Sequence, residues 1–154
     1  MNTNTIVIVS GGFDPLHTGH IEYLRSAKMF GMRLFVGVNS DDWLKRKKGN
    51  FFMPFEERLK IVESIKYVDQ AMGFNDDDDS AAALIRTIRQ NYPDLLLIFA
   101  NGGDRIGGTY QSELEMKEAD ERIIFAVGVG GTNKTNSSTN ILDRWTSLTR
   151  WKTS

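Results

Sequence analysis

The sequence predicts an α/β fold in which helices cover both faces of a parallel sheet. Five short segments have apolar residues that run continuously rather than alternately, which is typical of strands buried on both faces. These segments are residues 5–10, 34–38, 71–74, 95–100 and 123–127. Segments with helical spacing separate them, so that helices can connect successive parallel strands. We therefore expect a doubly wound, Rossmann-like sheet of five parallel strands.

The helices are predicted from their ends as well as from their apolar spacing. Thr18 is expected to cap a first helix that ends near Gly31, a residue type that often follows a helix. Pro54 is expected to begin a helix after a basic loop, and Ser80 to cap the next one. Two more helices are expected, at 111–120 and at the C-terminus, where one side carries Ile141, Leu142, Trp145 and Leu148. Trp145 is expected in the core or at an interface.

The length and composition predict one domain. A chain of 154 residues with 40% hydrophobic and 25% charged residues is ordinary for a globular protein. We expect a single domain over 1–154, with its core at about 5–142 and a C-terminal helix and tail at 137–154. The net charge of −1 gives no reason to expect nucleic acid or a membrane as a partner.

The absence of cysteine and the N-terminal segment indicate in which cellular compartment the protein is expected. The absence of cysteine excludes disulfides and thiolate metal sites, and is compatible with a reducing cytosol. The apolar run at 6–9 is too short for a signal peptide or a membrane span. We expect a soluble, cytoplasmic protein.

Polar and glycine-rich segments follow four of the five predicted strands. They are residues 11–20, 39–50, 101–108 and 128–136. The carboxyl ends of parallel strands meet at one edge of the sheet, where ligands bind in such folds. We therefore expect these four segments to form one ligand site.

The segment after the first strand carries both histidines of the protein, His17 and His20. Single histidines are commonly packed or superficial residues. Here a pair follows a buried strand and two glycines, which let the backbone turn and approach a ligand closely. The first amides of the following helix would form an anion site. Phosphate chemistry is the functional interpretation.

Residues 11–20 also resemble a known family. The pattern Gly-x-Phe-Asp-x-x-His-x-Gly-His is the signature of the cytidylyltransferase-like nucleotidyltransferase superfamily, and this chain matches every fixed position. The resemblance implies transfer of a nucleoside monophosphate from CTP or ATP to a phosphorylated small molecule, with release of pyrophosphate. It implies that both histidines are catalytic, and it implies nucleotide binding by Gly11, Gly12, Phe13, Asp14 and Gly19.

The basic run at 45–48 would usually be a solvated surface segment, but it lies on the predicted site edge, where it could neutralise a triphosphate. It resembles the corresponding loops of bacterial heptose-phosphate adenylyltransferases and glycerol-3-phosphate cytidylyltransferases. In the cytidylyltransferases two lysines two residues apart contact phosphates. The resemblance implies catalytic roles for Lys45 and Lys47, with Arg46 and Lys48 as alternatives.

Three later segments extend the resemblance. Arg58 matches a position that reaches the active site in the cytidylyltransferases, although a surface helix arginine is the alternative interpretation. Residues 101–104 resemble the Lys-Gly-Gly-Asp of the heptose enzymes, with asparagine replacing lysine. Residues 136–141 resemble a Ser-Thr-Thr-Asn-Ile segment that holds the triphosphate, and Lys134 is the nearest cation upstream. The nucleotide-binding residues implied are Asn101, Gly102, Gly103, Asp104, Lys134, Ser137, Ser138 and Thr139.

Two other patterns, a glycine-rich segment and an acidic run, are not expected to be functional sites of their own. Residues 128–135 resemble a Walker A loop but carry Asn133 where its second glycine is required. The acidic run at 76–79 could attract a metal, but charge at a turn before a helix is the preferred explanation. Mg²⁺ is expected to bridge the triphosphate without a dedicated protein cage.

The resemblance leaves the substrate open. The first interpretation is a cytidylyltransferase of the glycerol-3-phosphate type, and the alternative is an adenylyltransferase acting on a heptose 1-phosphate or similar sugar phosphate. A nucleotide-binding regulator that keeps the fold without turnover is the non-enzymatic alternative. Small members of the superfamily are commonly dimers, so a homodimer is also considered.

Overall fold

The computed structural model describes residues 4–102, 110–130 and 137–149. Its strands are β1 (Thr5–Gly11), β2 (Arg33–Val38), β3 (Gln70–Gly73), β4 (Leu96–Gly102) and β5 (Ile123–Val129). Its helices are α1 (Thr18–Lys28), α2 (Asp41–Lys48), α3 (Phe55–Glu63), α4 (Ala82–Asn91), α5 (Gln111–Ala119) and α6 (Ser138–Thr149). All strand pairs are parallel, in the order β3-β2-β1-β4-β5. The predicted fold class is confirmed.

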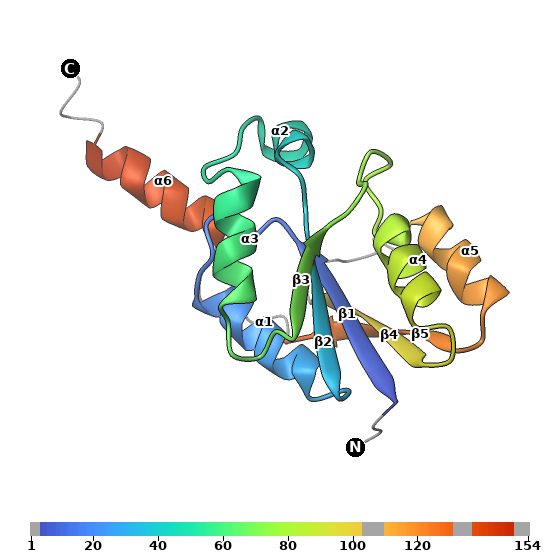
Figure 1. The fold of residues 1–154 in the computed structure, drawn as a ribbon. Helices are drawn as coiled ribbons and strands as arrows, with labels where there is room; N and C mark the ends of the chain where they lie inside the picture. The colour runs from blue at the N-terminus through green and yellow to red at the C-terminus, as the bar shows by residue number, and fades with distance from the viewer. Residues whose placement is uncertain (1–3, 103–109, 131–136, 150–154) are drawn as a thin grey trace.

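Helices α1 and α3 cover one face of the sheet, and α4 and α5 cover the other (Figure 1). An apolar core lies on each face. Alternate residues of β1 supply both cores: Val7 and Val9 pack with α1 and α3, whereas Ile6 and Ile8 pack with α4. Because the chain turns from β1 toward β2 and β3 and then returns to β4, the strand order reverses between β1 and β4. Such a reversal is where open α/β sheets bind ligands.

The two ends of α1 differ from the prediction. His17 is the N-cap, and Thr18 is the first helical residue. The helix ends at Met29 in a right-handed conformation, so Gly31 does not supply a left-handed cap. A Cβ on Gly31 would lie 2.9 Å from Thr5 Cγ2 and 3.1 Å from Thr5 O. Glycine is therefore required there for close approach of the chain to β1.

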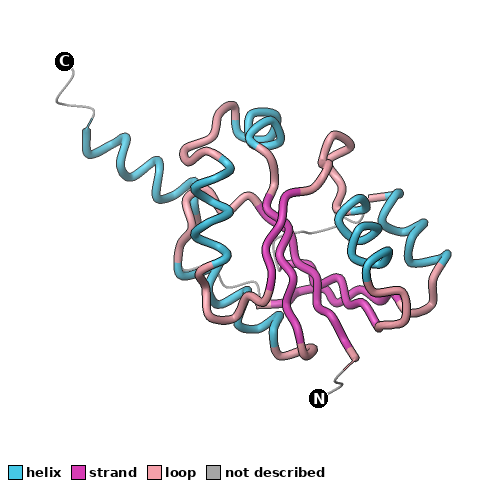
Figure 2. The backbone as a smooth tube through the Cα atoms, viewed as in Figure 1, coloured by secondary structure: helices cyan, strands magenta, loops and turns pink. Residues whose placement is uncertain are grey.

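The basic run forms helix α2 and not the predicted loop (Figure 2). Ser40 caps the helix through an Oγ that accepts from Trp43 N at 3.0 Å. Gly49, at φ 87°, ends it in the left-handed conformation. Leucine, lysine and arginine favour a helix once both ends are defined.

Other boundaries move by one or two residues. Pro54, predicted to begin a helix, is the N-cap of α3, which begins one residue later at Phe55. Ala81 is the N-cap of α4, although Ser80 Oγ still accepts from Ala82 N at 3.2 Å. Strand β4 extends two residues beyond the predicted segment, so Asn101 and Gly102 belong to a strand and not to a loop.

Helix α6 projects away from the sheet (Figure 1). Trp145 is 63% exposed, which rules out the predicted core position. Leu148 on the same helix is also exposed. Within the described ranges, none of the helices has the length and apolar character needed to cross a membrane.

Gly37 gives a test of the packing between β2 and α4. A Cβ at this position would lie 2.4 Å from Leu84 Cδ2 and 2.8 Å from Phe74 Cε1. Overpacking of this kind costs about 1–3 kcal/mol, so Gly37→Ala should lower the free energy of unfolding by that amount. Urea unfolding measures it, and a wild-type midpoint would contradict the tight contact.

Candidate functional site

The two histidines are linked through the backbone at the start of α1. Nδ1 of His17 accepts a hydrogen bond from Gly19 N at 3.0 Å, and Nδ1 of His20 accepts one from His17 N at 3.2 Å. This is a reciprocal capping box formed by imidazoles. The rings lie with their centroids 4.0 Å apart and their planes inclined by 34°.

These bonds determine which nitrogen of each ring can donate. A neutral imidazole has one N–H and one acceptor nitrogen, so a ring that accepts at Nδ1 carries its proton on Nε2. This tautomer is inferred from the hydrogen-bond network. Two Nε2–H donors therefore stand at a helix N-terminus, where backbone amides and the helix dipole also favour an anion. The arrangement is suited to binding phosphate oxygens.

Phe13 and the glycines fix the turn before the histidines. Phe13 has φ 53° and is buried, and its ring meets His20 edge-on with centroids 5.1 Å apart. Gly11 O accepts from Asn39 N at 2.9 Å. A Cβ on Gly12 would lie 2.9 Å from Leu44 Cδ2. A side chain at position 12 would therefore force Leu44 to shift, because α2 packs directly on the histidine turn.

Asp14, predicted to bind the nucleotide, contacts the segment between α2 and α3 in this structure. Its buried carboxylate accepts hydrogen bonds from Phe52 N at 2.6 Å and from Met53 N at 2.7 Å. The side chain therefore holds the segment between α2 and α3 against the histidine turn. We expect it to support the site and not to contact the nucleotide directly.

Arg58, the arginine predicted to reach the active site, has a side chain that is 0% exposed in this structure. Its guanidinium donates through Nη1 to Gly12 O at 2.9 Å and Asn39 O at 2.7 Å. Nε donates to Met53 O at 2.9 Å, and Nη2 donates to Asp41 Oδ1 at 2.7 Å. One buried cation thus joins the histidine turn, the end of β2, the start of α2 and the segment before α3.

The basic helix α2 meets the acidic run at 76–79. Arg46 Nη2 donates to Asp79 Oδ1 at 3.1 Å, and Lys47 Nζ lies 3.5 Å from Asp79 Oδ2. Lys45 lies instead over the ring of Phe51, 5.5 Å from its centroid. Residues two apart on a helix do not share a face. Lys45 and Lys47 therefore point in different directions, although both belong to the helix beside the histidine turn.

The acidic run is part of the fold. Buried Asp76 accepts from Asn39 Nδ2, Ser40 N and Ser40 Oγ at 2.7–3.0 Å. Hydrogen bonds from the side chain and then the backbone of Ser80 lower the pKa of Asp78. In the part of the chain that the structure describes, no group of three or more His, Asp or Glu side chains could hold a metal. Sequence reasoning missed the Asp76 contacts because they join residues far apart in the chain.

Helix α6 begins at the same turn. Ser138 Oγ donates to Pro15 O at 2.8 Å, and Ser137 Oγ accepts from Asn140 N at 3.0 Å, whereas Thr139 is exposed. Tyr23 Oη donates to Ala100 O at 2.6 Å, which joins α1 to β4.

Of the remaining predicted site residues, Asn101 and Gly102 end β4. Gly103, Asp104 and Lys134 lie outside the described residues.

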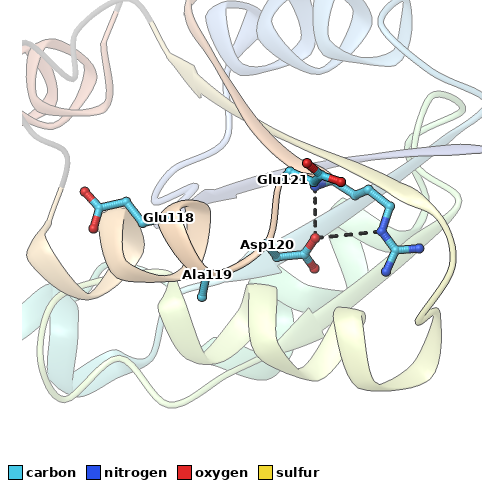
Figure 3. A pocket seen from close by; sticks show the side chains of 5 residues that line it. Glu118, Ala119, Asp120 and Glu121 are labelled. Carbon is cyan, nitrogen blue, oxygen red and sulfur yellow. Dashed lines mark hydrogen bonds and ion pairs between the residues drawn. The ribbon is translucent and has the colours of Figure 1, made fainter.

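A polar hollow lies elsewhere, between α5 and β5 (Figure 3). It is lined by residues 118–122, and Asp120 Oδ1 accepts from Arg122 N at 2.9 Å within it. It stands at the amino end of β5, the sheet edge opposite the histidines. It does not belong to the candidate site.

The fold and the site define an α/β protein with a phosphate-type anion site: a parallel sheet whose carboxyl edge carries paired histidines and a basic helix. The chain belongs to the cytidylyltransferase-like family, whose model matches residues 8–144.

Individual relatives and a solved structure agree with this membership. Bifunctional protein HldE of Syntrophotalea carbinolica is 34% identical over 143 residues, 92% of this chain. HldE of Citrobacter koseri is 40% identical over 101 residues, 64% of this chain. The match spans only 28% and 20% of these two relatives. The lipopolysaccharide core biosynthesis protein from Thermoplasma volcanium has TM-score 0.61 and 28% identity, covering 86% of this chain and 98% of that one.

Proposed function

We propose that this protein transfers a nucleoside monophosphate from a nucleoside triphosphate to a sugar phosphate and releases pyrophosphate. The paired Nε2–H donors at the start of α1 carry this proposal, because they can stabilise charge at a phosphorus centre. The neighbouring basic helix and the family membership support it.

The chemistry needs positioning more than acid–base catalysis. The acceptor phosphate is already an anion, so one of its oxygens attacks the α-phosphorus without a general base. A new P–O bond forms as the bond to the β-phosphate oxygen breaks, and pyrophosphate leaves with the electron pair. His17 and His20 donate to the oxygens of the α-phosphate as charge develops in the transition state.

The other groups bind the triphosphate. Cations of α2 neutralise its charge, and Lys45 is free of carboxylate ion pairs among the described residues. Ser137 and Thr139, at the start of α6, are proposed to hold the β- and γ-phosphates. Mg²⁺ enters with the nucleotide as its phosphate complex.

The sugar-phosphate alternative is now preferred to the glycerol-3-phosphate type. The similarity to the HldE relatives and to the lipopolysaccharide core biosynthesis protein of Thermoplasma volcanium favours it. The basic segment resembles loops of both enzyme types, whereas residues 101–104 resemble those of the heptose-phosphate adenylyltransferases, so ATP is the expected nucleotide. We propose a heptose 1-phosphate as the first acceptor to test.

Pyrophosphate release by the 154-residue chain tests the proposal, with MgATP or MgCTP against heptose 1-phosphate or glycerol 3-phosphate. Release should be fastest with MgATP and heptose 1-phosphate. A preference for MgCTP and glycerol 3-phosphate would instead support a cytidylyltransferase of the glycerol-3-phosphate type. Tight nucleotide binding by calorimetry without release in any pairing would favour the regulator.

A further inference from the structure

The cations of α2 have unequal surroundings. Arg46 and Lys47 share one carboxylate: Arg46 Nη2 and Nε lie 3.1 and 3.3 Å from Asp79 Oδ1, and Lys47 Nζ lies 3.5 Å from Asp79 Oδ2. Lys45 contacts an aromatic ring instead. The Asp79 carboxylate therefore contacts two of the four cations of α2, and Arg46 Nη2 also lies 3.9 Å from Asp76 Oδ1.

The backbone holds Asp79 in place. Its φ of 66° is in the left-handed region, which aspartate and asparagine tolerate better than most residues. Asp79 N donates to Asp76 O at 2.9 Å, and Arg46 Nη2 donates to the same oxygen at 2.7 Å. The carboxylate of Asp76 is bonded in turn to Ser40, the cap of α2. The loop therefore presents the Asp79 carboxylate at a defined position beside the basic helix.

We propose that Asp79 sets the affinity for the triphosphate by competing with it for Arg46 and Lys47. The carboxylate occupies both cations in the nucleotide-free protein, and phosphate oxygens replace it when the nucleotide binds. This inference rests on the proposed function, because it takes α2 to be the phosphate-binding helix.

Arg46, Lys47 and Asp79 are exposed enough for phosphate oxygens to replace the Asp79 carboxylate. The side chains of Arg46, Lys47 and Asp79 are 39%, 38% and 32% exposed, so their ion pairs are partly solvated and weak. Arg58, by contrast, is 0% exposed, although its carboxylate partner Asp41 is 30% exposed, so the guanidinium itself is closed to a phosphate. A triphosphate carries several charges and can displace a single partly exposed carboxylate from two cations.

Asp79→Asn tests the competition, because asparagine keeps the shape and tolerates the same backbone conformation while removing the charge. Calorimetry should give a Kd about three- to tenfold lower than wild type for MgATP and for inorganic tripolyphosphate at low salt. The difference is expected to shrink as the salt approaches about 0.5 M, because such pairs are screened.

Asp77→Asn is the matched control. Asp77 lies in the same loop and is exposed, and it forms none of the ion pairs found in the described ranges. The control removes the same charge and should leave the Kd within about twofold of wild type. An equal gain in both variants would mean that the net charge of the loop, and not competition for two cations, sets the affinity.

A double-mutant cycle with Lys47→Met adds a readout that a structural role would not produce. The substitution should weaken tripolyphosphate binding more in the Asp79→Asn background than in wild type, because only there is the lysine already released. Unchanged Kd values in Asp79→Asn, with no coupling to Lys47→Met, would overturn the inference and leave the proposed function standing. If neither the wild type nor any variant binds nucleotide or tripolyphosphate, the competition by Asp79 and the proposed function are both contradicted.

Discussion

His17→Asn and His20→Gln should each reduce turnover by about 10²–10³-fold, the usual cost of removing one transition-state donor. Asparagine is a good N-cap and can accept from Gly19 N in place of His17 Nδ1. Glutamine at the third helical position preserves the reciprocal cap made by His20 Nδ1. Neither replacement supplies the imidazole Nε2–H. Pyrophosphate release at saturating substrate, with unfolding measured in parallel, checks the prediction.

His17→Ala separates the structural role of the histidine from the chemical one. Alanine removes both the donor and the cap, so this variant should lose turnover and also about 1 kcal/mol of stability. His17→Asn should lose turnover alone. Near-normal turnover in the asparagine variant would show that His17 only caps α1 and does not stabilise the transition state.

The strands could be predicted because their signal is local. Continuous apolar runs identified all five strands, and the histidine pattern placed the site at the end of the first. Helix α2 was missed although Ser40 and Gly49 were both in place as end signals. Four consecutive cations are typical of a solvated loop, whereas Ser40 before them and Gly49 after them are typical of the two ends of a helix.

The site's supporting contacts could not be predicted in the same way. Asp76 bonds to Ser40, which is 36 residues away in sequence, and Asp14 bonds to Phe52, which is 38 residues away. Nothing in the local sequence distinguishes these carboxylates from solvated ones. The proton positions on the imidazoles also depended on knowing that His17, and not Thr18, caps α1.

The burial of Arg58 had a local signal that was not used. Arg58, Val62 and Ile65 follow the spacing of four and then three residues that places side chains on one helical face. Val62 lies in the core on the buried side of α3, so Arg58 shares the side that packs on the sheet. A charge at such a position predicts a buried guanidinium with several acceptors, because an unpaired buried charge is strongly destabilising.

Arg58→Met is therefore expected to destabilise the protein by about 3–5 kcal/mol, the usual cost of breaking a buried ion pair from one side. Methionine has a comparable length but leaves the carbonyls of Gly12, Asn39 and Met53 without their donor. Urea unfolding measures the loss, and a change below about 1 kcal/mol would contradict the central position given to this side chain.

Arg58→Lys distinguishes charge from geometry. Lysine keeps the cation but presents a single ammonium in place of a planar fork, so it cannot reach the acceptors on both sides of the site together. We expect stability between that of Arg58→Met and wild type, together with a raised KM for the nucleotide. The KM should rise because Arg58 joins Gly12 of the histidine turn to Asn39 and Asp41 at the start of α2. If the fork sets the distance between the imidazoles and the basic helix, loss of the fork loosens the site even where the fold survives.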